Sequence, residues 1–563
     1  MSATNESGTL VIKGGTVVDG TGAEGQRADV AIEGGTIKEI GQNLTGDRVL
    51  EADGCIVSPG FIDIHTHYDA QVFWDPALTP SCFHGVTTVV AGNCGFSLAP
   101  IKSTDHELIA NTMEKVEDMN PATLLEGVPW NDFETFPQYL SAVERRGTVL
   151  NFAAYLGHTP LRLYVMGDEA VGRPANAAEL ATMGAIIREA MDAGAVGFAT
   201  SFAATHLGAD GSPIPSRWAD RAELESLFSA VAATGKGIIG VNGGDNLSLR
   251  DNYVLQRQVG IPFTYTAVLT NPSGGHLKAL EINRQGWEEG GEVWLQVSCR
   301  PLTFSMTLVE PFTLNTNPVF AELSGGSVEA RRAAYADPAW RDRAREAWNE
   351  KRAFRPRWST MEIMETRAHP DLIGRRLSEI AEERGIDAFD CLMDLAVAEP
   401  DVAMRIKVLI ANDDEEGVKT LLNAPGTTLG LSDAGAHVGQ LCDAPLPTDL
   451  LGNWVRGREV LTMEAAIRKL TGQQADLFGF ADRGYLKAGY AGDVAVFDPA
   501  TVAPGPVRRV RDFPAGAERL TADAPVGMRH VVVNGRPIQV DGTFLQDSLA
   551  DRPGQLVRPA PRG

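Results

Sequence analysis

The middle of the chain alternates short apolar runs with amphipathic helical stretches, and this alternation most constrains the fold. Each run stops at a small or polar residue: GVTTVVAGN, TVLNFAAYLGH, GAVGFATSF, KGIIGVNGG, PFTYTAVLT, EVWLQVS, RIKVLIAN and GTTLGLSDAG. Helical stretches such as AELATMGAIIREAMDAGA lie between several of them. Buried strands that alternate with helices favour a parallel sheet, and so many repeats favour a distorted TIM-type (β/α)8 barrel over residues 59–484.

Both ends of the chain have a different pattern. Residues 1–58 contain alternating apolar and polar runs that end in Gly-Gly, Asp-Gly or Pro-Gly, and similar runs return within residues 485–563. This pattern is typical of antiparallel strands joined by tight turns. We therefore expect the two ends to pair into one small β-sandwich domain.

The stretch at about 301–400 interrupts the alternation. It is rich in Arg, Trp and Pro, has helical spacing and shows no obvious strand. The simpler interpretation is a helical insertion that covers one edge of the barrel. The functional alternative is a lid or an oligomer contact.

Composition excludes several classes of protein. The formal net charge of −23 opposes nonspecific binding to nucleic acid or to anionic membranes. Six cysteines are too few for a disulfide scaffold, no signal peptide is visible at the N-terminus, and no run approaches the roughly 18 apolar residues of a membrane helix. The expectation is a soluble, reduced, cytoplasmic protein, with homo-oligomer formation left open.

His65 and His67 give the strongest chemical signal. They close the apolar run in GFIDIHTHYD, two positions apart. Residues i and i+2 of a strand point to the same side, so both imidazoles can reach one metal ion. A single histidine would more often be an ordinary core or surface residue, but this pair at a strand end predicts a metal site.

Two motifs then carry a family resemblance. PGFIDIHTHYD, after an N-terminal strand region, resembles the amidohydrolase superfamily of metal-dependent barrels. VVAGNCGFSLAP resembles the Asn-Cys-Gly signature of the N-acyl-D-amino-acid deacylase (D-aminoacylase) family, of which this chain looks like a divergent branch. The resemblance extends over nearly the whole chain, through GHTPLR, AGAVGFATS and LGLSDAGAH.

The resemblance implies roles for two further metal-site residues. Cys94 would be a metal ligand, in the place that a carboxylated lysine fills in other amidohydrolases, and the alternative is a buried structural cysteine. Asp433 would bind the metal and carry a proton from the attacking water to the leaving group. The alternative for Asp433 is a helix N-cap.

Three residues are predicted to contact substrate. The resemblance suggests that His158, at another strand end, contacts substrate or the transition state, with Arg162 as a companion. Arg162 could instead be a surface salt-bridge partner. His437, four residues after Asp433, would bind substrate or the metal.

The chain departs from the family in one respect. The deacylases carry two more ligand histidines on strands five and six, but GIIGVNGGDN and PFTYTAVLT contain none. His206 and His276 follow these strand ends by several residues and lie outside the motif. We therefore expect one metal ion rather than two, held by His65, His67 and Asp433, with Cys94. Zinc suits such a soft Cys/His site.

The expected function is hydrolysis of an amide-type C–N bond in a small molecule, an N-acyl-D-amino acid or related N-acyl compound, by metal-activated water. Two alternatives remain from the sequence. One is a different reaction on the same metal platform: lactone or ester hydrolysis, or a C–C cleavage such as decarboxylation or retro-aldol cleavage. The other is a non-catalytic amidohydrolase-like protein.

Overall fold

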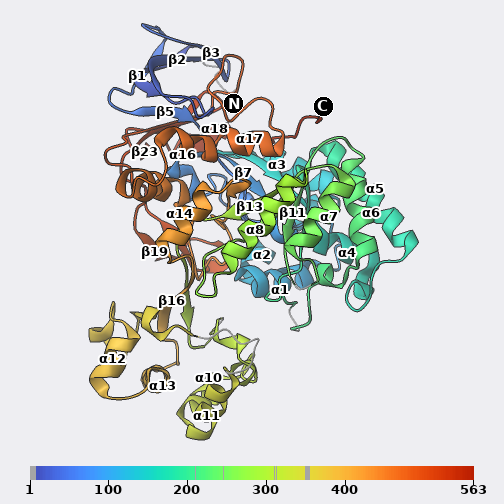
Figure 1. Ribbon diagram of the computed structural model, residues 1–563, viewed down its shortest axis with the longest axis vertical. Helices are drawn as coiled ribbons and strands as arrows, with labels where there is room; N and C mark the ends of the chain where they lie inside the picture. Colours follow the sequence, from blue (N-terminus) through green and yellow to red (C-terminus); the bar gives the residue numbers. More distant parts are fainter. Residues whose placement is uncertain are drawn as a thin grey trace. The chain divides into compact units, whose positions relative to one another are not determined.

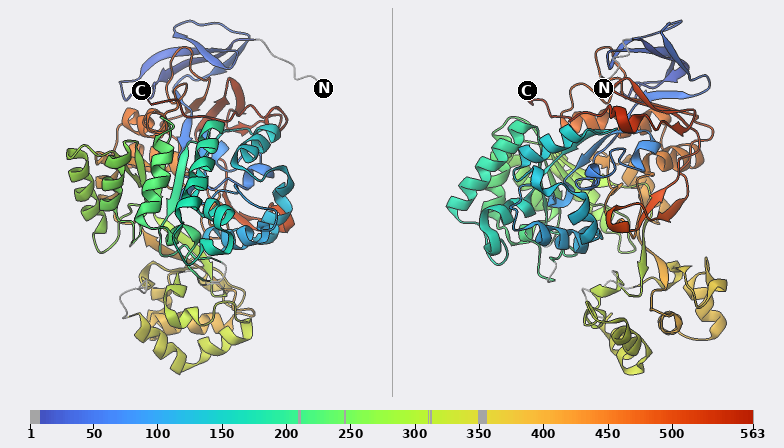
Figure 2. Two further views of the ribbon diagram at one scale, coloured as in Figure 1. Left: turned by 90° about the vertical axis from the view of Figure 1, so that its right-hand side faces the viewer. Right: turned by 180° about the vertical axis from the view of Figure 1, so that it is seen from behind.

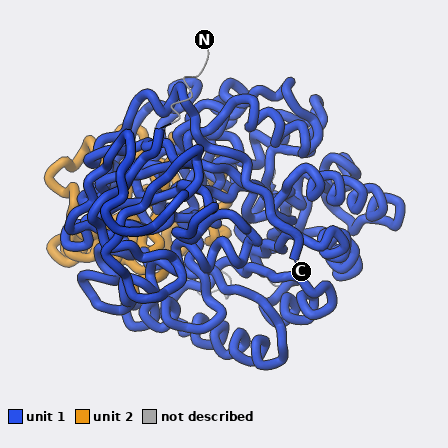
Figure 3. Tube along the Cα trace, turned by 90° about the horizontal axis from the view of Figure 1, so that it is seen from above, with its two compact units in different colours: residues 1–300, 414–438, 442–563 blue, residues 301–413, 439–441 orange. Residues whose placement is uncertain are grey.

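The computed structural model describes residues 8–208, 211–244, 246–309, 311, 313–348 and 356–562. The chain divides into two compact units (Figure 3). The first contains residues 1–300, 414–438 and 442–563, and the second contains residues 301–413 and 439–441. None of the described helices is both long and apolar enough to cross a membrane.

Strands from both ends of the chain pair in one sheet of the first unit. Its order is β23-β22-β21-β18-β5-β1-β2-β3, with β4 also paired to β1. The bounds are β1 (Leu10–Val17), β2 (Gln26–Glu33), β3 (Thr36–Gly41), β4 (Arg48–Glu51), β5 (Ile56–Pro59), β18 (Val494–Phe497), β21 (Met528–Val533), β22 (Arg536–Val540) and β23 (Thr543–Phe544). The antiparallel pairing of β18 with β5 joins the N-terminal strands to the C-terminal ones (Figure 1). A separate hairpin comprises β19 (Val507–Val510) and β20 (Arg519–Ala522).

The central strands of the first unit form two parallel sheets. One has the order β6-β7-β8 and the other β17-β13-β12-β11-β10-β9. The bounds are β6 (Phe61–Asp63), β7 (Val86–Ala91), β8 (Asn151–Ala154), β9 (Leu156–Gly157), β10 (Gly197–Ser201), β11 (Ile238–Asn242), β12 (Phe263–Thr266), β13 (Val293–Val297) and β17 (Thr427–Leu429). Every residue of β7 and β10 is buried, which explains why these runs are apolar without alternation.

The two parallel sheets are linked on both sides. One residue, Tyr155, separates β8 from β9, and its backbone N–H donates to the carbonyl of Ala91 in β7. On the other side, Thr66 and Ala434 form a parallel bridge just beyond the ends of β6 and β17. The carboxyl ends of the first and last central strands therefore lie side by side.

Helices connect the central strands and pack along their outer side (Figures 1 and 2). They are α1 (His106–Glu117), α2 (Pro121–Gly127), α3 (Phe136–Arg146), α4 (His158–Met166), α5 (Ala177–Ala193), α6 (Arg221–Ala232), α7 (Leu249–Val259), α8 (Gly275–Glu288) and α14 (Glu415–Asn423). Further along the chain lie α15 (Leu446–Asp449), α16 (Met463–Leu470), α17 (Gly472–Phe478) and α18 (Ser548–Asp551). The boundaries follow local chemistry: α5 begins after an Asn176 capping box and ends at Gly194, whose φ of 115° suits glycine.

The second unit contains strands as well as the expected helices, and one of these strands was expected in the barrel. It contains α9 (Pro318–Ala321), α10 (Val328–Ala336), α11 (Pro338–Ala347), α12 (Leu377–Arg384) and α13 (Ala388–Ala398), but also β14 (Leu302–Thr307), β15 (Glu362–Glu365) and β16 (Arg405–Ala411). The strands form an antiparallel sheet in the order β14-β16-β15. The run RIKVLIAN is β16, so its assignment to the central parallel strands was wrong. Aromatic side chains such as Phe320, Trp340 and Phe389 fill a separate core.

Candidate metal centre

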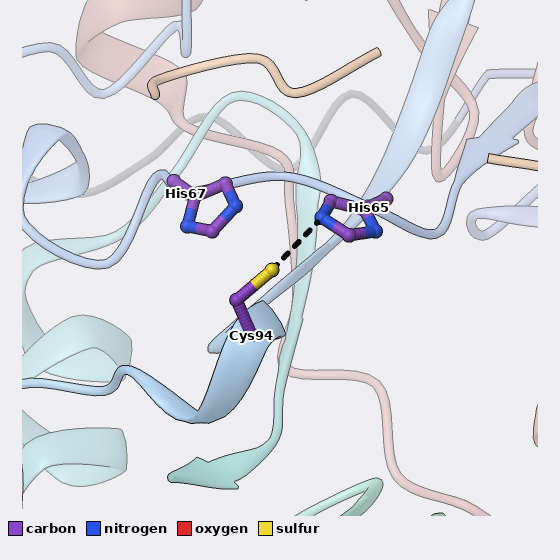
Figure 4. Close-up of side chains that lie close together, drawn as sticks. All are labelled: His65, His67 and Cys94. Carbon is purple, nitrogen blue, oxygen red and sulfur yellow. Dashed lines mark hydrogen bonds between the residues drawn. The ribbon is translucent and has the colours of Figure 1, made fainter. Parts of the chain in front are cut away.

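Three predicted ligands converge at the carboxyl ends of the first two central strands. His65 and His67 follow β6, and Cys94 lies in a short turn after β7. Their ligand atoms all lie within 4.8 Å of one another, and Cys94 Sγ is 3.6 Å from His65 Nε2 (Figure 4). Both histidines are 1% exposed. The i, i+2 spacing therefore places both imidazoles on the same side of the chain, as expected.

Asp433 joins this cluster from the opposite end of the sequence. Its Oδ1 atom is 3.3 Å from Nε2 of His65 and 3.3 Å from Nε2 of His67. The bridge between Thr66 and Ala434 explains this position, because it fixes the segment after β17 beside the segment after β6. One carboxylate oxygen thus faces both imidazoles.

The electrostatics of the cluster match a cation site. Burial raises the pKa of the Cys94 thiol, but the His65 and His67 imidazoles outweigh it and bring that pKa down to about 6. Burial lowers the pKa of His65, but Cys94 and Asp433 raise it to about 10. The same histidines hold the pKa of Asp433 well below its usual range against the effect of burial. The thiolate and the carboxylate therefore attract positive charge into a buried site.

This donor set fits a divalent metal ion. Two imidazole nitrogens, one thiolate and one carboxylate are the ligand types that zinc takes in four-coordinate sites. The soft sulfur favours zinc over magnesium or calcium, which prefer oxygen ligands. The chain thus offers the complete set that the sequence predicted for one ion.

The backbone at the site is strained. Cys94, Asp433 and His437 have φ angles of 55°, 50° and 46°, in the left-handed region that residues with a side chain rarely adopt. Such conformations persist where the surrounding structure imposes them, and they cluster at functional sites.

Three side chains that the sequence did not single out contact the candidate ligands. Gln296 Oε1, in β13, is 2.6 Å from His65 Nδ1. Glu117 Oε1, at the end of α1, is 3.3 Å from His67 Nδ1. Asn242 Nδ2, at the end of β11, donates to Cys94 Sγ at 3.4 Å. Asn242 and Gln296 are polar residues at or near strand ends, and this position is the one sequence feature that could have indicated them. No sequence feature indicated Glu117.

His158 and Arg162 lie in a buried ion network. His158 Nδ1 is 2.8 Å from Thr200 Oγ1, and its Nε2 is 3.0 Å from Glu223 Oε1. Arg162 contacts both carboxylate oxygens of Glu223 and also donates to the carbonyl of Arg173 at 2.6 Å. Arg162 is buried, so it is not the surface partner that the sequence left open. The substrate role of both residues stays a prediction.

Two other histidines, His206 and His437, lie near the site. Burial, with a contribution from His437, lowers the pKa of His206 to about 3. His206 Nδ1 is 2.8 Å from Ser201 Oγ, and its ring packs edge-on against Phe96. His437 is half-buried. His206, which the motif did not include, thus lies nearer to the site than its sequence position indicated.

Comparison with known proteins finds similar sequences over nearly the whole chain. The model of the amidohydrolase family matches residues 48–539. N-acyl-D-glutamate deacylase of Alcaligenes xylosoxydans xylosoxydans is 31% identical over 98% of this chain and 96% of its own length.

Two solved structures share the mixed α/β fold. One is an N-acyl-D-glutamate deacylase from Bordetella bronchiseptica in complex with zinc and a phosphonate inhibitor. It has a TM-score of 0.66 and 28% sequence identity, and the match covers 98% of this chain and 99% of that one. The other is a D-aminoacylase described by a binuclear metal centre with one-metal activation and second-metal attenuation. It has a TM-score of 0.66 and 26% identity, with the same coverage.

Proposed function

The chain belongs to the amidohydrolase family, and we propose that it hydrolyses the amide C–N bond of N-acyl-D-amino acids or related N-acyl compounds with one zinc ion. The observation that carries the proposal is the buried cluster in which Asp433 Oδ1 lies 3.3 Å from both His65 and His67. The relatives named above act on N-acyl-D-amino acids or carry metal.

The proposal includes the architecture around the site. The eight central strands, with β8 and β9 counted as one, close into a distorted (β/α)8 barrel within residues 59–484. The link at Tyr155 and the bridge between Thr66 and Ala434 support closure, because they join the two parallel sheets on both sides. The described strands within residues 1–58 and 485–563 supply the two halves of a β-sandwich, supported by the pairing of β5 with β18.

His65, His67, Cys94 and Asp433 would hold the metal ion. When bound, the ion would lower the pKa of a coordinated water and polarise the scissile carbonyl. A single ion is supported by the strand-five position, where Asn242 offers an amide donor to Cys94 rather than an imidazole.

Asp433 carries the proton in the proposed reaction. Its carboxylate accepts a proton from the attacking water and then delivers it to the departing nitrogen, so no separate acid is needed. The low pKa of Asp433 means that it begins the cycle ionised, as a proton acceptor must. His437, half-buried near the site, binds substrate. His158, with Arg162 as a companion, contacts substrate or the transition state from α4, which directly follows β9.

The test begins with metal content. Elemental analysis of protein purified without added metal should give about one zinc per chain, and His65→Ala should lose it. N-acyl-D-amino acids with acidic and neutral side chains are then assayed beside their L-enantiomers, lactones and β-keto acids. Cleavage of lactones or β-keto acids without any amide hydrolysis would overturn the proposed reaction. Metal-free protein without activity would indicate a non-catalytic member of the family.

A further inference from the structure

The carboxylate of Glu117 occupies a position that is unfavourable for an acid. It is the last residue of α1, and it is 2% exposed. Burial penalises a charged group, and the carboxyl end of a helix carries partial negative charge that repels an anion. Neither helix formation nor packing therefore accounts for a glutamate here.

The residues packed near the end of α1 suggest why a glutamate lies there. Val116, the preceding residue, packs in a small cluster with Phe96, and Cys94 packs against it. This contact directs the end of the helix toward the segment that carries the metal ligands. Glu117 Oε1 then lies within ion-pair distance of His67 Nδ1, at 3.3 Å. That nitrogen has no other partner among the described residues, so Glu117 is the group placed to accept its proton.

We infer that Glu117 is a positioning residue of the metal site, which accepts the Nδ1 proton of His67 and so presents the Nε2 lone pair to the ion. His67 Nε2 is the atom beside Asp433, which leaves Nδ1 on the far side of the ring. A carboxylate on that side fixes the tautomer and the ring orientation, and it makes the coordinating nitrogen more basic. Glu117 acts through His67 and has no contact with substrate in this role.

The other histidine supplies an internal comparison. His65 Nδ1 is held by the neutral amide of Gln296 at 2.6 Å. The two imidazoles are thus oriented by groups of similar shape and different charge, from β13 and α1. The charged partner adds an attraction for the cation that the amide does not, so Glu117 should contribute to affinity as well as to orientation.

The inference rests on the proposed metal site, and the test separates the two. Dissociation constants for Zn²⁺ and Co²⁺ are measured by chelator competition on the full-length protein and on Glu117→Ala, Glu117→Gln and Glu114→Gln. Glu114 is exposed and lies one turn earlier on the same helix, which makes it a matched control. The absorption spectrum of the Co²⁺ form reports the geometry of the ligands independently of activity.

We expect Glu117→Ala to weaken metal binding about 10- to 100-fold, in the range found for such outer partners. Glu117→Gln should recover part of the loss, because its carbonyl oxygen still accepts the proton, and its Co²⁺ spectrum should resemble that of the unmodified protein. Glu114→Gln should change neither quantity.

Unchanged affinity and spectrum in a folded Glu117→Ala protein would overturn the inference. If that variant does not fold, the metal affinity of Glu117→Gln decides. An affinity equal to that of the unmodified protein, with a lowered melting temperature of the metal-free protein, would assign Glu117 a structural role alone. Failure of the unmodified protein to bind metal would instead overturn the proposed function.

Discussion

Replacement of Glu223 by glutamine should destabilise the first unit strongly. Glu223 is buried in α6 and accepts hydrogen bonds from His158, Arg162 and the backbone N–H of Ala175. The amide keeps the shape of the side chain but removes its charge, which leaves the Arg162 guanidinium buried without its counterion. Breaking one half of a buried ion pair costs about 3–5 kcal/mol.

The lowered pKa of Glu223 leads to a similar free energy for the same interaction. Burial raises this pKa, but the hydrogen bonds from His158 and the charge of Arg162 outweigh it and lower it from 4.5 to about 2. A difference of that size corresponds to about 3 kcal/mol of stabilisation of the ionised form. At about 2.1 cal/mol/K per residue, the first unit has an unfolding entropy of about 1 kcal/mol/K, so the melting temperature should fall by about 3–5 °C.

Differential scanning fluorimetry of Glu223→Gln from pH 3 to pH 8 measures this effect. Because the folded-state pKa is the lower one, the stabilisation is complete above about pH 5 and is lost as the pH falls from 4.5 toward 2. The difference between the two proteins should shrink in that acid range. Glu225→Gln, a partly exposed acid on the same helix, is the control and should shift by less than about 1 °C. A Glu223→Gln shift no larger than the control at pH 7 would refute the reasoning.

Three further predictions concern the metal site. Asp433→Asn should lower the turnover number about 10²- to 10⁴-fold in steady-state assays, because it removes the proton acceptor; full activity in a folded variant would rule out the proton transfer. Removal of zinc by a chelator should lower the melting temperature by about 3 °C, since saturation at about 100 times the dissociation constant contributes about 2.7 kcal/mol, and re-addition of zinc should reverse it. Asn242→Leu removes the amide donor to Cys94 Sγ. The sulfur-to-Co²⁺ charge-transfer band should therefore move to lower energy, and metal binding should weaken by up to about tenfold. An unchanged band would show that the contact is not maintained in the metal-bound protein.

The cluster of candidate ligands was predictable because its signals are local in sequence. His65 and His67 are two positions apart, and Cys94 and Asp433 each follow an apolar run. Parallel strands bring such ends to one edge, so the structure joins them as expected. Glu117 could not be found this way. Its role depends on where the end of α1 packs, which is a tertiary property without a spacing of its own.

One apolar run of the sequence was assigned to the wrong sheet. RIKVLIAN looks like a central strand, but in β16 the side chains of Ile406 and Val408 are buried in the core of the second unit, while Arg405 and Lys407 alternate with them. That alternation is typical of a sheet with one solvated face, which the run length alone does not reveal. Likewise β14 and β15 are short strands inside a region dominated by helices, so their signal was weak.

The pairing of β14 with β16 has a consequence for how this chain could diversify. Leu302 lies opposite Ala411, so the two ends of the segment 301–413 are neighbours across one strand pair. Residues 439–441 join the second unit separately. Neighbouring strands are about 5 Å apart, a gap that a two-residue turn can close. The intervening hundred or so residues thus form a cassette. Such a cassette can be shortened, exchanged or lost in related genes without moving the ends that hold it.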